Sequence, residues 1–171
     1  MSQSELSRLV KLKALTEDDI VVQASAAECE ALAKRFAVSE IHELNALITL
    51  TPQKSEIVAT GTLSARWSQP CAVSGDDFET SSNETIHLRF VPPYDETPGE
   101  ELEISSEDWD EIPYEGDSFD LGEAVAQSFG LLIDPYATGP NADRIRKEKG
   151  IEIEGEQSGA MAEMLAALTK E

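Results

Sequence analysis

The segment from Ile57 to Ser68 alternates so regularly that it constrains the fold more than any other part of the chain. Every second residue from Ile57 to Trp67 is apolar or glycine, whereas the positions between them, from Val58 to Ser68, are mostly polar. A period of two is typical of a strand with one buried and one solvent-exposed face. The sequence therefore predicts a strand whose inner face packs against the rest of the protein.

Two more segments alternate in the same way, one on each side of this strand. Their apolar residues are Leu44, Ala46, Ile48 and Leu50 before it, and Ile86, Leu88 and Phe90 after it. Residues 52–55 and 74–77 are rich in the residue types that favour turns. Three strands joined by short turns predict an antiparallel meander, with Arg66, His87 and Arg89 on its exposed face.

A first helix is predicted at residues 26–36. Ser25 and Glu28 before it have the spacing of a capping box, in which each side chain bonds the backbone amide of the other residue. Apolar residues then recur at helical spacing along a single stripe, formed by Cys29, Leu32, Ala33 and Phe36. Short strands are expected before this helix, at residues 6–12 and at Val21 and Val22.

A second helix is predicted at residues 120–133. Asp120 and Glu123 repeat the capping-box spacing at its start, and Pro135 follows its end. Leu121 opens its apolar stripe, and towards its end the helix is apolar on nearly all sides. We expect it to be a core helix that packs against the sheet. A last amphipathic helix is predicted at residues 159–169.

These elements predict a small α+β protein, in which an antiparallel meander packs against two main helices. We expect one domain over residues 1–135, with a long acidic loop at residues 92–118 that contains a short helical turn near residues 107–110. Residues 136–158 are expected to form a mobile charged linker, and residues 159–171 a C-terminal helix that packs back on the domain or docks on a partner.

The negative charge of the chain is concentrated in one block. The formal net charge is −21, and residues 71–134, with 18 acidic residues and 1 basic residue, account for −17 of it. Such a block repels phosphate backbones and attracts basic surfaces. It is either a solubilising loop or a protein-binding surface. The candidate binding residues are Asp95, Glu96, Glu100, Glu101, Glu103, Glu107, Asp108, Asp110 and Glu111.

The alternative is direct binding of RNA. Arg66, Trp67 and Arg89 are the best candidates in the sheet, and Arg144, Arg146, Lys147 and Lys149 form a basic cluster at residues 144–149. Such binding would weaken steeply with salt. The simpler interpretation, which we favour, is that the two arginines of the sheet pair with nearby acidic residues.

Few residues offer catalytic or metal chemistry. The chain has two histidines, His42 and His87, and two cysteines, Cys29 and Cys71. They form no zinc-binding cluster. Cys71 follows Pro70 at a predicted turn, so we expect it to be partly exposed, and a nucleophilic pair with His87 is the one enzymatic alternative. We expect a protein without enzymatic activity, metal or cofactor.

No apolar run approaches the roughly 18 residues that a membrane helix needs, so no membrane partner is expected. The two cysteines do not suggest a disulfide framework. A cytoplasmic location is therefore expected.

The order of the motifs resembles the YceD family, the large ribosomal RNA subunit accumulation proteins of bacteria and plastids. The resemblance extends from about residue 5 to the end of the chain. Its first motif is Gln69 and Cys71 after the central strand, followed by the return strand and the acidic stretch. Asp120 and Leu121 then stand at the start of a helix, and Pro135 stands after that helix. Residues 164–170 are the last motif.

The resemblance implies a non-enzymatic role in the accumulation or processing of large-subunit ribosomal RNA, without a known cofactor. Many members of the family have a Cys-x-x-Cys motif at the hairpin, and Ser68 takes the place of its first cysteine here. A zinc or redox role of that pair is therefore not expected. The expected partners are a precursor of the large ribosomal subunit, ribosomal RNA, or a basic ribosomal protein held by the acidic block until assembly.

Overall fold

The computed structural model describes residues 4–15, 18–54, 56–93 and 110–151. The chain divides into two compact units. The first comprises Met1–Gln69 and Glu79–Asp134, and the second comprises Pro70–Phe78 and Pro135–Glu171. The predicted helix at residues 159–169 lies outside the described residues.

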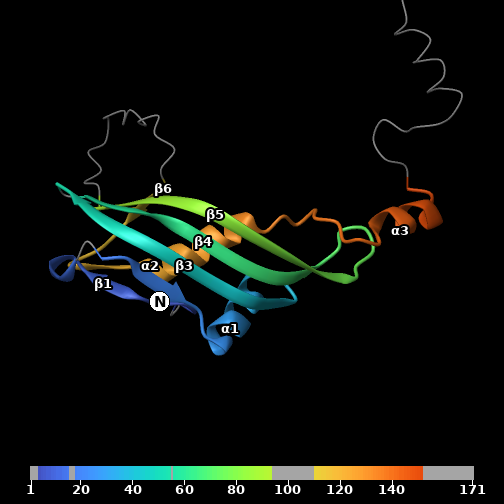
Figure 1. The fold of residues 1–171 in the computed structure, drawn as a ribbon, viewed down its shortest axis with the longest axis horizontal. Coiled ribbons are helices and arrows are strands. Elements are labelled where there is room, and N and C mark those ends of the chain that lie inside the picture. Colours follow the sequence, from blue (N-terminus) through green and yellow to red (C-terminus); the bar gives the residue numbers. More distant parts are fainter. Residues whose placement is uncertain (1–3, 16–17, 55, 94–109, 152–171) are drawn as a thin grey trace, which may run out of the picture. The chain divides into compact units, whose positions relative to one another are not determined.

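The first unit is built on a five-stranded sheet with the order β2-β3-β4-β5-β6 (Figure 1). Its strands are β2 (Ile20–Gln23), β3 (Glu40–Gln53), β4 (Glu56–Pro70), β5 (Asp77–Val91) and β6 (Asp110–Pro113). Strands β2 and β3, and strands β3 and β4, pair in antiparallel fashion. The three long neighbours β3, β4 and β5 are the predicted meander.

A second, two-stranded sheet pairs β1 (Leu9–Lys11) with β7 (Ser118–Asp120) in antiparallel fashion. A single turn of 3₁₀-helix, η1 (Leu12–Ala14), follows β1. This small sheet ties the start of the chain to the segment that leads into the second helix. It was not predicted, because β7 has only three residues and shows no alternation over so short a length.

The expected acidic loop at residues 92–118 is partly wrong. Its described part contains β6, which pairs in parallel with the end of β5, so that Leu88 lies beside Asp110 and Val91 beside Pro113. Ile112 packs against the hydrophobic core. The short helical turn expected near residues 107–110 is therefore not present at Asp110, where backbone pairing with the sheet edge is made instead.

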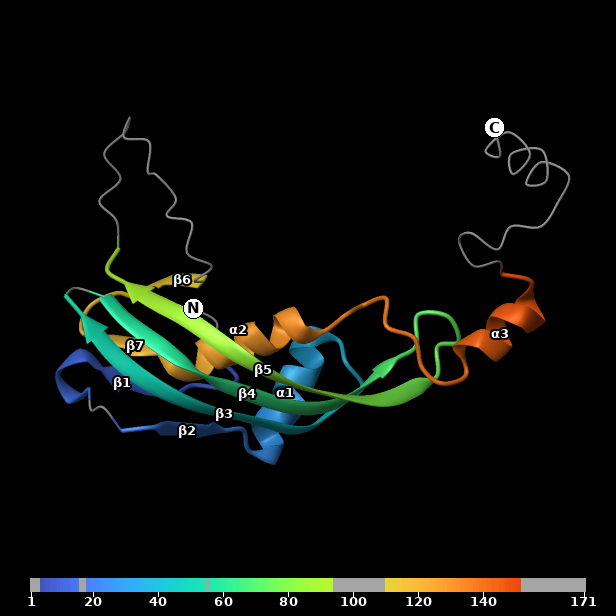
Figure 2. The same ribbon diagram turned by 45° about the horizontal axis from the view of Figure 1, so that its top comes forward.

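Two helices cover one face of the large sheet (Figures 1 and 2). Helix α1 (Ala26–Phe36) begins with the predicted capping box: the Ser25 hydroxyl accepts from the Glu28 amide at 3.4 Å, and the Glu28 carboxylate accepts from the Ser25 amide at 2.7 Å. Helix α2 (Leu121–Leu132) ends before Pro135, as predicted.

The capping box of α2 is only half formed. The Asp120 carboxylate accepts from the Glu123 amide at 3.1 Å, which caps the helix. The Glu123 carboxylate does not complete the box, because it accepts hydrogen bonds from Arg35, Ser4 and Gln127 instead. A sequence pattern limited to four residues does not contain these competing donors.

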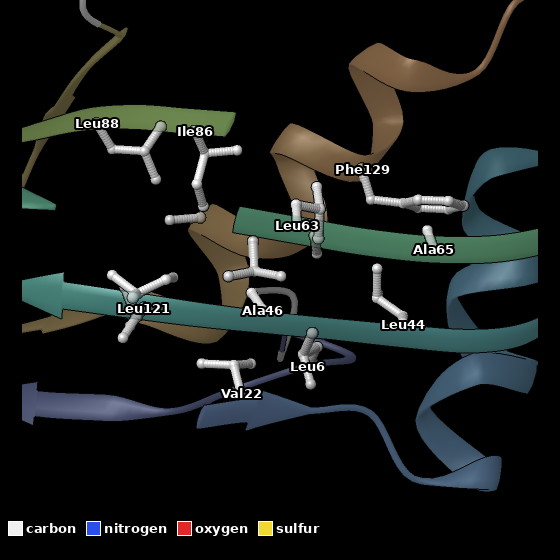
Figure 3. Packing of buried hydrophobic residues seen from close by; sticks show 14 of the residues in the cluster. Leu6, Val22, Leu44, Ala46, Leu63, Ala65, Ile86, Leu88, Leu121 and Phe129 are labelled. Carbon is white, nitrogen blue, oxygen red and sulfur yellow. The ribbon is translucent and has the colours of Figure 1, made fainter. Parts of the chain in front are cut away.

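The core lies between the sheet and the two helices (Figure 3). Phe129 of α2 packs edge-on against Trp67 of β4 and Phe36 of α1, with ring centroids 5.3 Å and 5.6 Å apart. Leu6, before β1, is completely buried in the same cluster. One expectation fails here: Leu131, on the apolar end of α2, has 77% of its surface exposed.

The described part of the second unit contains a tight turn and one helix. The Cys71 amide donates to the Asp76 carbonyl at 2.9 Å, and Gly75 takes the left-handed conformation that this turn requires, with φ of 78°. Helix α3 (Ala142–Lys149) lies within the segment expected to be a linker, and its first residue, Ala142, is buried. This helix was not predicted, since its residues carry no apolar stripe.

Candidate interaction surface

The described part of the acidic block is exposed. Of the nine candidate binding residues, the structure describes Asp110 and Glu111, which lie on β6 beside the end of β5. Glu115 and Asp117, which follow β6, are also exposed. The other seven candidates, Asp95, Glu96, Glu100, Glu101, Glu103, Glu107 and Asp108, lie outside the described residues. We call Asp110, Glu111, Glu115 and Asp117 the acidic segment.

Arg89, a candidate for RNA binding, lies between two acidic side chains. Its Nε atom is 3.7 Å from a carboxylate oxygen of Glu56, and its Nη1 atom is 3.5 Å from a carboxylate oxygen of Glu111. Only 16% of the Arg89 side chain is exposed. Arg89, the single lysine or arginine of residues 71–134, thus has a carboxylate on each side and a largely buried side chain.

Arg66, the second candidate, is exposed on the outer face of the sheet, the face opposite α1 and α2. Its Nη1 atom is 3.4 Å from a carboxylate oxygen of Glu79, which is also 3.7 Å from the ring of His42. Such an exposed ion pair contributes little stability, but the nearby carboxylate opposes the attraction that the arginine alone would exert on a phosphate. Both arginines of the sheet thus have acidic partners, which is the interpretation favoured from the sequence.

Trp67 does not form part of an RNA-binding surface. It is 3% exposed, packs on Phe129, and donates from its indole nitrogen to the Gln69 side chain at 2.7 Å. This burial argues against Trp67 as one of the candidate RNA-binding residues. The alternation of β4 already places Trp67 on the face opposite Arg66, so the two side chains cannot belong to one surface.

Gln69, one of the residues that carry the family resemblance, holds β4 to the end of α2. Its side chain is 3% exposed, accepts from Trp67, and donates to the Asp134 carbonyl at 2.7 Å. A buried amide that satisfies both a donor and an acceptor stabilises the position of the elements that supply them. Gln69 therefore has a structural explanation that needs no ligand, and Pro135 after α2 is exposed.

Cys71 is buried. This corrects the expectation that Cys71 is partly exposed at the turn. The hydroxyl and the backbone amide of Ser74 hydrogen-bond its sulfur and lower the pKa of the thiol to about 6. The Ser74 amide lies 3.4 Å from the sulfur. The sulfur acts here as the acceptor that closes the turn, and only 4% of the Cys71 surface is exposed.

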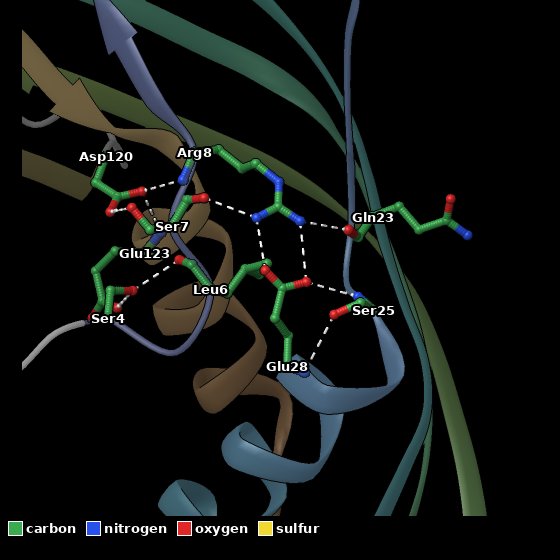
Figure 4. A network of polar contacts seen from close by, with 9 residues as sticks. All are labelled: Ser4, Leu6, Ser7, Arg8, Gln23, Ser25, Glu28, Asp120 and Glu123. Carbon is green, nitrogen blue, oxygen red and sulfur yellow. Dashed lines mark hydrogen bonds and ion pairs between the residues drawn. The ribbon is translucent and has the colours of Figure 1, made fainter.

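Asp120 and Leu121 join the start of the chain to α2. The Asp120 carboxylate, besides capping α2, accepts from the Ser7 hydroxyl at 2.6 Å and from the Arg8 amide at 2.8 Å (Figure 4). The Arg8 side chain continues the network to Glu28 of α1 at 2.7 Å. Leu121 is completely buried beneath these contacts.

Two carboxylates of this region are held in the ionised form. A two-point hydrogen bond from Arg35 lowers the pKa of Glu123 to about 2, and the Arg8 guanidinium lowers the pKa of Glu28 to about 2. Both pairs link α1 to neighbouring segments, and the Arg35 side chain is 30% exposed. They stabilise the arrangement of the helices.

A hollow that the sequence did not indicate opens between the start of α1 and β3. Its volume is about 620 Å³, and Cys29, Glu40, His42 and Arg66 are among the residues that line it. The register of β3 shifts between Ile41 and Glu43, which makes His42 the irregular residue, and its Nε2 atom is 2.8 Å from the Ser68 hydroxyl. Bulges are common at functional positions, and a change of register leaves no signal in the alternation.

The basic cluster of residues 144–149 lies on helix α3. Arg144 pairs with Glu148 and Arg146 with Asp143, each at 2.9 Å. Lys147 and Lys149 are exposed. The helix thus carries its own acidic partners for both arginines.

Neither metal sites nor membrane spans are found within the described part of the chain. No group of three or more histidine, cysteine, aspartate or glutamate side chains in residues 4–15, 18–54, 56–93 and 110–151 could hold a metal ion. Among these same residues, no helix has the length and apolar character needed to cross a bilayer.

Comparison with known proteins gives one match. The family model described as "Large ribosomal RNA subunit accumulation protein YceD" matches residues 59–169. This range includes Gln69, Cys71, Asp120, Leu121 and Pro135. No curated protein and no solved structure matches the chain significantly.

Proposed function

The chain belongs to the YceD family of large ribosomal RNA subunit accumulation proteins, and on this premise we propose that it acts without catalysis, by binding a basic ribosomal protein in the cytoplasm until the large subunit assembles. The family connects the chain with the pathway of large-subunit ribosomal RNA. The distribution of charge suggests the kind of partner. A precursor of the large subunit would then be the destination of the captured protein.

The observation that carries this proposal is the contrast between the acids and the bases of the first unit. Arg66 and Arg89 are both paired with carboxylates, whereas the acidic segment is exposed. Residues 71–134 carry a charge of −17. A surface of one sign attracts and orients a partner of the opposite sign and raises the rate of association. Ribosomal RNA would be repelled by the same field.

The experiment is affinity capture from cell lysate with the tagged full-length chain, in two halves of which one is treated with nuclease. We expect basic large-subunit proteins to stay bound after nuclease treatment, as read by mass spectrometry. Asp110→Lys with Glu111→Lys, and separately Glu100→Lys, Glu101→Lys and Glu103→Lys, should reduce the captured amount severalfold. Asp18→Lys with Glu30→Lys is the matched control, since it reverses two exposed acids outside residues 71–134. Equal capture by all variants would contradict the proposal.

Direct binding of ribosomal RNA is the second candidate. Helix α3 favours it, because it presents the exposed Lys147 and Lys149 within one turn of each other. Arg66 and Arg89 would contribute only if their acidic partners were displaced. If the captured proteins disappear with the RNA in the nuclease-treated half, this candidate replaces the first, and Arg89→Glu should then weaken RNA binding.

A further inference from the structure

Strand β5 has a long edge that the neighbouring strand does not cover. β5 comprises Asp77–Val91, but β6 pairs only with Leu88–Val91. Of the strands that the structure describes, β4 lies along the opposite edge of β5, and no strand other than β4 and β6 adjoins β5. Figure 2 shows β6 beside one end of β5 only. Residues 79–86 therefore present an edge to which a further strand can be added.

Strand edges matter because their backbone groups still need hydrogen-bond partners. Alternate N–H and C=O groups of an edge strand point away from the sheet and pair readily with an extended chain. Residues 79–86 contain two acids and several small polar residues, and most of them are exposed. At about 3.3 Å per residue, these eight residues offer a pairing length of roughly 26 Å.

A hollow lies beside this edge, on the side of α2. Its volume is about 280 Å³, and it is lined by Glu84, Ile86 and Leu88 of β5, by Asp110 of β6, and by Leu131 and Leu132 of α2. Drug-sized ligands occupy about 300–1,000 Å³, so this hollow suits one large apolar side chain better than a whole small molecule. Leu131, with 77% of its surface exposed, forms its apolar wall.

The charge at the edge selects the partner. Glu79 and Glu84 lie on the free part of β5, and Asp110 and Glu111 lie at its end. A second copy of this edge would bring the same charges together, which opposes self-pairing. An extended segment with lysine or arginine on the face that it turns towards α2 would meet Glu84 and Asp110 instead.

From this edge, hollow and charge, we propose that residues 79–86 bind an extended basic segment of a partner protein by strand addition. An apolar side chain of that segment occupies the hollow between Ile86 and Leu131, and basic side chains two residues before and after it, on the same face of the segment, face Glu84 and Asp110. Backbone hydrogen bonds give affinity in this mode of recognition, and the side-chain hollow gives specificity. The inference rests on the proposed function, since it names the surface that would hold the basic protein.

The first test uses a defined probe and the full-length chain. The probe is a nine-residue peptide with blocked ends that has valine at its centre, lysine two residues to each side of the valine and threonine elsewhere, so that valine and both lysines share one face. Its control carries N-methyl groups on alternate residues, which removes half of its backbone donors and leaves its charge unchanged. We expect the unmodified peptide to bind with protection of the amides of residues 79–86 from hydrogen exchange, as measured by NMR. The N-methylated peptide should bind about tenfold more weakly, the loss expected for roughly one good hydrogen bond. Equal binding of both peptides, or protection elsewhere, overturns strand addition.

Variants of the protein complete this test. Glu84→Lys and Leu131→Lys should each weaken binding of the unmodified peptide about tenfold, because they reverse the charge at the edge or fill the hollow with a charged group. Both side chains are exposed, so both variants should fold. Glu30→Lys on α1 is the matched control and should bind like the unchanged protein. Unchanged affinity of the two edge variants overturns the proposed placement.

A second test separates this inference from the proposed function. Nuclease-treated lysate is passed over the unchanged chain and over the Glu84→Lys variant with Leu131→Lys. If the unchanged chain captures basic large-subunit proteins and the variant loses them, both proposals are supported. If the two chains capture them equally, the edge is not the surface, although the proposed function stands. If neither captures them, the proposed function fails, whatever the peptide does.

Discussion

At the scale of single residues, the fold depends on polar groups that each satisfy more than one partner. Gln69 bonds both Trp67 and the carbonyl of Asp134, and Asp120 bonds the backbone of the N-terminal segment as well as the start of α2. Arg35 holds Glu123 through two hydrogen bonds and also contacts Glu5 at 3.0 Å. Each of these side chains joins segments that are distant in the sequence.

Replacing Arg35 should make the free energy of unfolding depend less on pH in the acidic range. The pKa of Glu123 is lowered from 4.5 to about 2 in the folded chain, so its contribution is fully present above pH 4.5 and is lost as the pH falls towards 2. We expect Arg35→Gln to lower the free energy of unfolding by about 1 kcal/mol at pH 7. The difference in the free energy of unfolding between the variant and the unchanged protein should disappear as the pH falls from 4.5 to about 2. Urea unfolding at several pH values measures it, and Lys34→Gln, in an exposed pair, should show a much smaller effect.

At the scale of elements, the N-terminus of α2 is the place where the most segments meet. The backbone of the segment before β1 passes so close to α2 that a Cβ atom at Gly122 would lie 2.7 Å from the Leu6 carbonyl oxygen and 2.8 Å from the Arg8 nitrogen. Both obstacles are backbone atoms, which cannot rotate away. Glycine at this position is therefore required by the packing of the N-terminal segment.

Gly122→Ala tests which of two opposing effects is larger. Helix propensity alone favours alanine by about 1 kcal/mol, whereas overpacking against fixed backbone costs about 1–3 kcal/mol. We expect a net loss of stability, detected as a lower urea midpoint. Gly130→Ala is the matched comparison in the same helix, where the added carbon would meet the Phe36 ring at 2.6 Å. Because a ring can shift, this variant should lose less, and a larger loss than for Gly122→Ala would contradict the argument.

At the scale of the whole molecule, the decisive property is the uneven charge. The net charge of −21 arises mainly from residues 71–134, and the described acids of that block are exposed. Long-range attraction of this kind acts over about 10 Å at 0.1 M salt and over about 3 Å at 1 M. Salt should therefore affect the formation of a complex more than its lifetime.

This predicts how binding of the captured basic protein depends on ionic strength. Between about 0.05 M and 0.5 M sodium chloride, the association rate should fall roughly tenfold to a hundredfold, with a much smaller change in the dissociation rate. Stopped-flow fluorescence or biolayer interferometry measures both rates. An association rate that is independent of salt would show that the acidic block does not attract the partner.

The local elements could be predicted from the sequence because their signals are local. The alternation in β3, β4 and β5 and the capping box of Ser25 and Glu28 are each contained within a few residues. The remaining features depend on distant partners. Gln69 bonds a carbonyl 65 positions away, and Glu123 bonds an arginine 88 positions away. No short pattern contains either pair.

The candidate surface could be predicted only in part, for the same reason. The negative block is visible in the composition, and the pairing of Arg66 and Arg89 with acids was anticipated. The edge of β5 that no described strand covers was not, because it depends on how few residues β6 pairs with β5, and the sequence pattern does not show that pairing. Helix α3 and the burial of Cys71 were missed, since neither has an apolar pattern of its own.

The burial of both cysteines has a practical consequence for studying this protein. Cys29 and Cys71 are the only thiols of the chain, and neither is exposed. A maleimide fluorophore should therefore react slowly with the native chain and rapidly with a single cysteine introduced at the exposed position 83, as Asn83→Cys. The protein without the introduced cysteine then serves as the control, and binding of a partner at β5 can be followed by the fluorescence of the single dye.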